Sequence, residues 1–193
     1  MPKIHTSKLV EHRDWRRQQL IEAAASIALE SGGAAVTVAS VAEKAGLSRT
    51  SVYEYFSSSA DLIAELIIEE LTHFVKVLTD AIENPLEPEK AIADWIQAAL
   101  RYIADGRHIL AKALSAISTP NERAVEIGAA HRALLAPLHK SLIDLGIKDL
   151  NQALSLIQSS TDVATKRIEG GADAEYEIRS TTAFCLAGIT ALI

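Results

Sequence analysis

The chain has 193 residues, of which 49% are hydrophobic, and its formal net charge at pH 7 is −6. This length suits one or two domains, and the apolar content is ample for a helical core. No apolar run approaches the roughly 20 residues that span a bilayer, and the N-terminus lacks the apolar segment of a signal peptide. One cysteine cannot form an internal disulfide, so we expect a cytoplasmic protein with no membrane partner.

The charge is unevenly distributed along the chain. Residues 1–60 contain seven basic and six acidic side chains, a net of +1, which leaves −7 for the remainder. Any contact with a polyanion is therefore expected near the N-terminus.

Residues 1–13 are expected to form a mobile arm. Its basic side chains either follow phosphates or enter the minor groove of a nucleic acid, or they belong to a solvated tail, and these interpretations stay open. A helix is expected from about Asp14 to Ser31, followed by Gly32 and Gly33 as its C-terminal stop. The apolar positions with helical spacing in that segment are Trp15, Leu20, Ala24, Ile27 and Ala28.

The segment from Thr37 to Leu62 predicts two short helices joined by a tight turn. Thr37 can cap a helix over Val38–Lys44, Gly46 allows the turn, and Ser48 can cap a second helix over Arg49–Phe56. Val52 and Phe56 are expected to point into the core. This arrangement is typical of a helix-turn-helix, whose second helix fits the major groove of DNA.

The side chains on the outer face of this motif suit DNA contacts. Arg49, Thr50 and Ser51 are our candidates for base contacts. The candidates for phosphate contacts are Thr37, Ser48, Tyr53, Tyr55 and either Arg16 or Arg17. For each of these two arginines, a plain surface charge is the alternative.

The same residues resemble the N-terminal DNA-binding domain of TetR-type transcriptional regulators. The resemblance covers about the first third of the chain. It rests on Leu20–Ala24, Gly32–Gly33, Thr37, Val41–Ala42, Ala45–Ser48, Ser51–Tyr53, Tyr55–Phe56 and Asp61–Leu62. The family often has glycine at the position of Thr50 and lysine at that of Ser59. The chain therefore departs from the family at one point of close approach to DNA and at one usual phosphate contact.

Helical patterns continue to the C-terminus, and no strand is evident. The expected helices are about Ala60–Glu83, Pro88–Ala104, Arg107–Ile117, a long helix from a capping box at Thr119–Glu122 to Leu145, Lys148–Glu169, and Asp173 to the end. Pro137 predicts a kink or break near Ala133–Ala136. We expect an all-α fold. An N-terminal three-helix helix-turn-helix domain spans residues 1–60, and a C-terminal helical bundle for effector binding and dimerisation spans residues 61–193.

The last helix is apolar on nearly all sides after Arg179, so a partner subunit is the simplest cover for it. The resemblance agrees, because these regulators usually dimerise through their last two helices. Burial within one chain is the alternative. The interface candidates are Leu150, Leu154, Ile157, Phe184, Leu186, Ile189 and Leu192.

A cavity between the helices of the C-terminal bundle is the expected site for a small molecule. It should be largely apolar with few polar anchors, although each aromatic residue is individually more often plain core. The candidate lining residues are Phe74, Trp95, Tyr102, Leu110, Leu114, His131 and Leu135.

No catalytic constellation, cofactor motif or metal site is evident. A metal site drawn from several helices stays open as an alternative, although each histidine is more often a surface or satisfied residue. His73, His108, His131 and His139 are not at the i, i+4 spacing of helical metal ligands, and Cys185 in an apolar helix reads as a buried, inert thiol.

The function favoured by the sequence is transcriptional regulation. A homodimer would bind a palindromic DNA operator, usually as a repressor, and a small-molecule effector of unknown identity would release it. The first alternative is a helical ligand-binding or scaffolding protein with a degenerate DNA-binding domain. An enzyme is the third class, against which the missing constellation argues.

Overall fold

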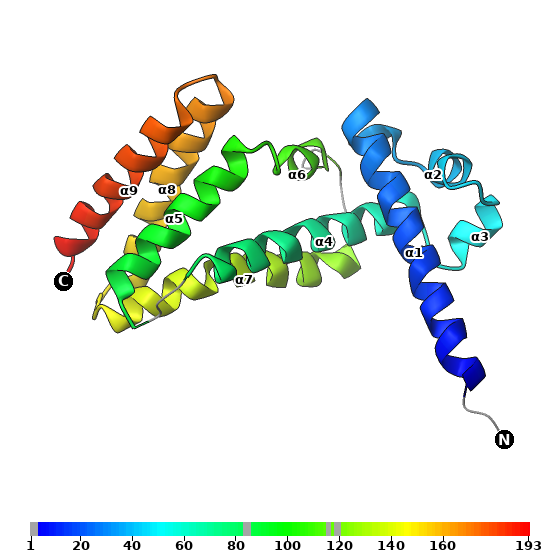
Figure 1. The fold of residues 1–193 in the computed structure, drawn as a ribbon, viewed down its shortest axis with the longest axis horizontal. Coiled ribbons are helices and arrows are strands. Elements are labelled where there is room, and N and C mark those ends of the chain that lie inside the picture. The colour runs from blue at the N-terminus through cyan, green and yellow to red at the C-terminus, as the bar shows by residue number, and fades with distance from the viewer. Residues whose placement is uncertain (1–3, 83–85, 115–116, 118–120) are drawn as a thin grey trace. The chain divides into compact units, whose positions relative to one another are not determined.

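The computed structural model describes residues 4–82, 86–114, 117 and 121–193. In these residues the chain forms nine α-helices and one short 3-10 helix, with no strand (Figure 1). The predicted all-α class is confirmed. The chain divides into two compact units, which are described separately. Unit 1 comprises Met1–Glu70 and Ile109–Ile127, and unit 2 comprises Leu71–His108 and Gly128–Ile193.

Unit 1 is built around the N-terminal helices. Its elements are α1 (Ile4–Ser31), the 3-10 helix η1 (Gly33–Ala35), α2 (Val38–Lys44), α3 (Arg49–Tyr53), the first half of α4 (Ser59–Asp80), α6 (Ile109–Leu114) and the start of α7 (Asn121–Asp144). Their buried side chains form one core that includes Leu20, Ala24, Val41, Val52, Phe56, Leu62 and Leu114. This core fixes the short helices α2 and α3, which are too short to be stable alone.

The mobile arm predicted over residues 1–13 is wrong from Ile4 onward, because α1 begins there. The extra turns contain no periodic apolar face, so the sequence carried no helical signal for them. Trp15 was also placed on the wrong face, since 54% of its surface is exposed. The other four predicted core positions of this helix are buried: Leu20, Ala24, Ile27 and Ala28.

The two glycines after α1 have different roles. Gly32 has a φ of 82°, a left-handed conformation that ends the helix. Gly33 lies against α6. A Cβ atom on Gly33 would be 2.7 Å from the carbonyl oxygen of Ala113 and 2.9 Å from Cγ1 of Ile117. There is consequently no room for a side chain at this position of η1, against α6.

Substitution Gly33→Ala is expected to destabilise unit 1 by about 1–3 kcal/mol, because a backbone carbonyl cannot move aside as a flexible side chain can. Chemical or thermal unfolding measures the effect. Gly128→Ala in α7 is the matched control, since its Cβ would meet only the tip of Arg132 at 3.3 Å. The control should unfold at the same or a higher temperature. Equal unfolding temperatures of the two variants would contradict the close approach of Gly33 to Ala113.

Unit 2 is a helical bundle. In it α5 (Pro88–Ala104), α8 (Leu150–Glu169) and α9 (Ala174–Thr190) pack side by side (Figure 1). The second half of α4 and most of α7 complete the unit. The core includes Leu78, Ile92, Ile96, Leu138, Leu142, Ile157, Ile178 and Ile189.

Helix α7 runs without interruption through Pro137, so the predicted break is wrong. Half-buried Leu134 before Pro137 and buried Leu138 after it pack against the core on both sides of the missing amide donor, and this packing outweighs the lost hydrogen bond. The predicted capping box at Thr119–Glu122 lies largely outside the described residues. None of the described helices is both long and apolar enough to cross a membrane.

Candidate functional site

The two short helices of the motif are capped as their sequence predicts. The Thr37 hydroxyl accepts a hydrogen bond from the amide of Ser40 at 3.0 Å, and the Ser48 hydroxyl accepts one from the amide of Ser51 at 3.1 Å. Gly46 has a φ of 66°, and the next amide, Leu47, returns to the carbonyl of Ala42 at 2.9 Å. This hydrogen bond closes the turn between α2 and α3.

Helix α3 presents polar side chains outward and apolar ones inward. Arg49 and Thr50 are exposed, and Tyr53 exposes 58% of its surface. Val52 and Phe56 are buried, as predicted. The helix ends at Tyr53 and not at Phe56, because the chain turns there to reach α4. A short, rigidly held helix with exposed donors is the arrangement that enters a major groove.

The remaining candidates for DNA contacts are less exposed. Ser51 and Tyr55 are half-buried, and the Arg13 guanidinium lies 6.0 Å from the centre of the Tyr55 ring. Arg16 and Arg17 are also half-buried on α1. Arg17 points toward α4, where it forms an ion pair with Glu65 and lies 3.7 Å from Glu69. Its role at a phosphate stays a prediction.

Ser59, where the resembled family often has lysine, makes an internal contact. Its hydroxyl accepts the amide hydrogen of Val38 at 2.9 Å, which joins the first turn of α4 to the first turn of α2. The adjacent Asp61 accepts from the amide and the hydroxyl of Ser57. These bonds position the end of the motif relative to α4.

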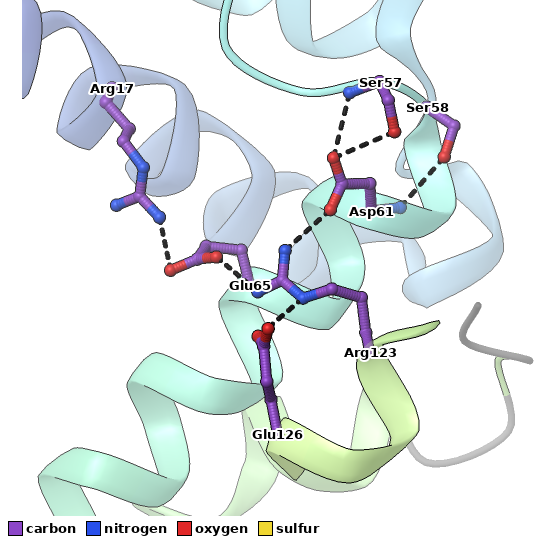
Figure 2. Close-up of polar contacts among 7 residues, drawn as sticks. All are labelled: Arg17, Ser57, Ser58, Asp61, Glu65, Arg123 and Glu126. Atoms are coloured by element: carbon purple, nitrogen blue, oxygen red, sulfur yellow. Dashed lines mark hydrogen bonds and ion pairs between the residues drawn. The ribbon is translucent and has the colours of Figure 1, made fainter. Parts of the chain in front are cut away.

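A cluster of charged side chains in unit 1 connects α1, α4 and the start of α7 (Figure 2). Arg123 donates to Asp61 at 2.7 Å and to Glu65 at 2.6 Å, and its Nε lies 2.8 Å from Glu126. Arg17 pairs with the other oxygen of Glu65. Nothing in the sequence indicated this cluster.

The pKa values of the cluster reflect both burial and pairing. Burial raises the pKa of Asp61 and of Glu65. Hydrogen bonds from Ser57 to Asp61, and from Arg123 and Arg17 to Glu65, outweigh burial, so both values lie below their ordinary range. The pKa of Glu69 is raised by burial and by the nearby charge of Glu65. Asp61 and Glu65 are therefore ionised at neutral pH.

Unit 2 contains an open cavity of about 680 Å³ between α4, α5, α7 and α8. Phe74, Trp95 and Leu135 lie on its apolar side, and the indole of Trp95 donates to the carbonyl of Leu134 at 3.0 Å. Half of the lining residues are polar: His131, Arg132, Ser155, Gln158, Ser159, Thr161, Asp162 and Thr165. The exposed surface of the cavity is largely apolar, as predicted, but α8 contributes more polar side chains than the few that were expected.

Four of the seven predicted lining residues meet at this cavity: Phe74, Trp95, His131 and Leu135. Tyr102 stacks on Phe74, with ring centres 4.3 Å apart, but lies outside the cavity lining. Leu110 and Leu114 were placed wrongly. Both are buried in the core of unit 1, because α6 packs against α1.

The last two helices expose an apolar surface. Phe184 is 70% exposed. Leu156 and Val163 of α8, which were not among the predicted interface residues, are 53% and 58% exposed. The seven-residue spacing of the latter two places them on one helical face, a signal that the sequence did contain. Ile157 and Ile189 are buried in their own chain, whereas Leu150, Leu154, Leu186 and Leu192 are half-buried.

Cys185 is buried, and burial raises the pKa of its thiol. A protonated, enclosed thiol is a poor nucleophile. Among the described residues, no group of three or more His, Cys, Asp or Glu side chains is arranged to hold a metal ion.

Comparisons with known proteins agree with this geometry. Residues 20–66 match the family model of bacterial regulatory proteins, tetR family. Over 97 residues the chain is 32% identical to the uncharacterised HTH-type transcriptional regulator YfiR of Bacillus subtilis. This match covers 49% of this chain and 47% of the relative. Over 75 residues it is 35% identical to the HTH-type transcriptional repressor KstR2 of Mycobacterium tuberculosis, 37% and 38% of the two chains. The match thus spans less than half the length of these curated relatives.

Solved structures share the whole fold. FadR of Bacillus halodurans, a fatty acid degradation regulator, superposes with a TM-score of 0.70 at 20% identity, covering 89% of this chain and 94% of its own. PfmR of Thermus thermophilus, a TetR family transcriptional regulator, has a TM-score of 0.67 at 23% identity, and the match covers 87% of this chain and 97% of PfmR. FadR of Bacillus subtilis, solved with stearoyl-CoA, has a TM-score of 0.69 at 20% identity, and the match covers 91% of this chain and 98% of that FadR. The family is one of transcription regulators and not of enzymes. Residues 20–66 therefore match the tetR family of bacterial regulatory proteins, and the chain as a whole shares its fold with solved regulators of that type.

Proposed function

We propose that the protein is a transcriptional repressor that binds an approximately palindromic operator as a homodimer and leaves it when a small-molecule effector binds. The observation that carries this proposal is α3, which is capped, held by Val52 and exposes Arg49, Thr50 and Tyr53. In this proposal residues 1–60 bind DNA, residues 61–193 bind the effector and dimerise, and the protein acts in the cytoplasm.

The apolar surface of α8 and α9 supports a homodimer. Leu156, Val163 and Phe184 are exposed on helices that otherwise pack into unit 2. A second copy of the same surface would cover them in a two-fold symmetric interface. Such a dimer reads half-sites about 34–36 Å apart, or a multiple of this distance, so the operator is expected to be palindromic.

The cavity of unit 2 supports a small-molecule effector. Its volume, about 680 Å³, is that of a typical ligand site. Phe74, Trp95 and Leu135 face a polar side from α8, which suits an amphipathic molecule with an apolar chain and a polar group. The stearoyl-CoA bound by Bacillus subtilis FadR is a molecule of this kind. The effector acts only if it binds the DNA-free conformation more tightly than the DNA-bound one.

The test is binding of the purified protein to labelled DNA that flanks its own gene, measured across a salt series. Sequence-specific binding that weakens steeply with salt is expected, because each phosphate contact releases counterions. Scrambled DNA of the same length is the control. Equal, weak binding to both fragments would contradict the proposal and favour a helical ligand-binding protein with a degenerate DNA-binding domain.

A further inference from the structure

The carboxylate of Glu65 in α4 is shared by two arginines (Figure 2). One oxygen pairs with Arg17 of α1, and the other accepts from Arg123 of α7 at 2.6 Å. The Glu65 side chain is only 16% exposed, so solvent screens these charges weakly. Each arginine therefore affects how strongly Glu65 holds the other.

The two arginines differ in their freedom to leave. Arg123 has Asp61 and Glu126 as further partners and is 20% exposed. Arg17 is 37% exposed, and its second carboxylate, Glu69, is 3.7 Å away. The guanidinium of Arg17 also lies 5.6 Å from the centre of the Phe56 ring, at the end of the helix-turn-helix. Of the two cations, Arg17 is the one placed to exchange its carboxylate for an external anion.

The charge balance makes this exchange depend on Arg123. The cluster contains two guanidinium groups, on Arg17 and Arg123, and four carboxylates: Asp61, Glu65, Glu69 and Glu126. Without Arg123, Arg17 would be the only cation among these four acids, and its transfer to a phosphate would leave the half-buried Glu65 without a cationic partner.

We propose that Arg123 is a positioning residue that neutralises Glu65 and so releases Arg17 to contact a DNA phosphate. This inference rests on the proposed function, and it adds a determinant of affinity outside the helix-turn-helix. Arg123 itself does not touch DNA in this mechanism. Because Arg123 belongs to α7, any rearrangement that withdraws it from Glu65 weakens DNA binding through Arg17.

The test is the operator affinity of Arg123→Gln, measured by fluorescence anisotropy over a salt series. Its dissociation constant is expected to rise on the order of tenfold, because each of the two subunits of a dimer loses one charge-assisted phosphate contact. The slope of log affinity against log salt should become shallower by about 2, close to 0.9 for each lost contact. Glu65→Gln should have the opposite effect on affinity, since it frees Arg17.

The decisive comparison is made in an Arg17→Gln background. There Arg123→Gln is expected to leave operator affinity unchanged, whereas a merely structural role of Arg123 would lower it by the same factor as before. Arg123→Lys should restore most of the affinity. Lys140→Gln is the matched control, since it removes one positive charge from the same helix, where Lys140 pairs with Asp144 at 2.6 Å.

Thermal unfolding of every variant separates folding from binding. The inference is overturned if Arg123→Gln binds the operator like the unmodified protein, or if its loss persists in the Arg17→Gln background. Failure of the unmodified protein to bind specific DNA would instead overturn the proposed function. If Arg123→Gln does not fold, Glu65→Gln alone decides the matter, because the inference requires it to bind DNA more tightly.

Discussion

Substitution of Arg49 by alanine is expected to abolish sequence-specific operator binding while leaving the fold intact. Arg49 is the first residue of α3 and its side chain is exposed, so no core contact is lost. A good side-chain contact to a base is worth about 1–3 kcal/mol, and a dimer makes it twice. The operator dissociation constant should therefore rise about 100-fold or more, as measured by anisotropy with labelled operator and scrambled DNA.

Lys148→Ala serves as the control for this change, because it removes one exposed positive charge from unit 2. It should alter binding less than twofold at physiological salt. If Arg49→Ala weakens binding to operator and to scrambled DNA by the same factor, Arg49 contacts a phosphate and not a base. If neither changes, α3 is not the helix that reads the sequence.

Substitution Phe184→Asp is expected to separate the dimer into monomers and, as a consequence, to weaken operator binding. Phe184 is 70% exposed in the single chain, on α9. An aromatic residue central to an interface contributes about 2–4 kcal/mol, and two-fold symmetry places it there twice. The dimer dissociation constant should rise on the order of 10³-fold, which sedimentation or light scattering over a concentration series can measure.

Val125→Asp provides the comparison, since Val125 of α7 is 74% exposed and the charge change is identical. That variant should remain a dimer at the same concentrations. A Phe184→Asp protein that sediments as the unmodified protein does would show that the α8 and α9 surface is not the interface. The operator would then have to be read by monomers or through another contact.

Local signals predicted the helix-turn-helix correctly. The caps at Thr37 and Ser48 and the turn at Gly46 depend on residues no more than six positions apart, and the structure contains each of them. Val52 and Phe56 were assigned to the core from spacing alone and are buried. The first turns of α1 were missed because their sequence has no apolar period.

Long-range packing could not be predicted from the sequence. Leu110 and Leu114 have the same spacing that a cavity-lining helix would have, and only the docking of α6 on α1 assigns them to unit 1. The pairs of Arg123 with Asp61 and Glu65 join residues 62 and 58 positions apart. No periodicity in one sequence links such distant charges, so this cluster required the three-dimensional structure.

The hydrogen bond from the Val38 amide to the Ser59 hydroxyl reduces the number of free amides at the start of α2 that could bind an anion. The first amides of a helix ordinarily attract phosphate because they lack partners. Here the amides of Thr37, Val38 and Ser40 already donate to hydroxyls of Ser40, Ser59 and Thr37. Most of the donors that a phosphate would seek are thus occupied before DNA arrives. At the start of α2, attraction for DNA is therefore expected from side chains more than from backbone amides.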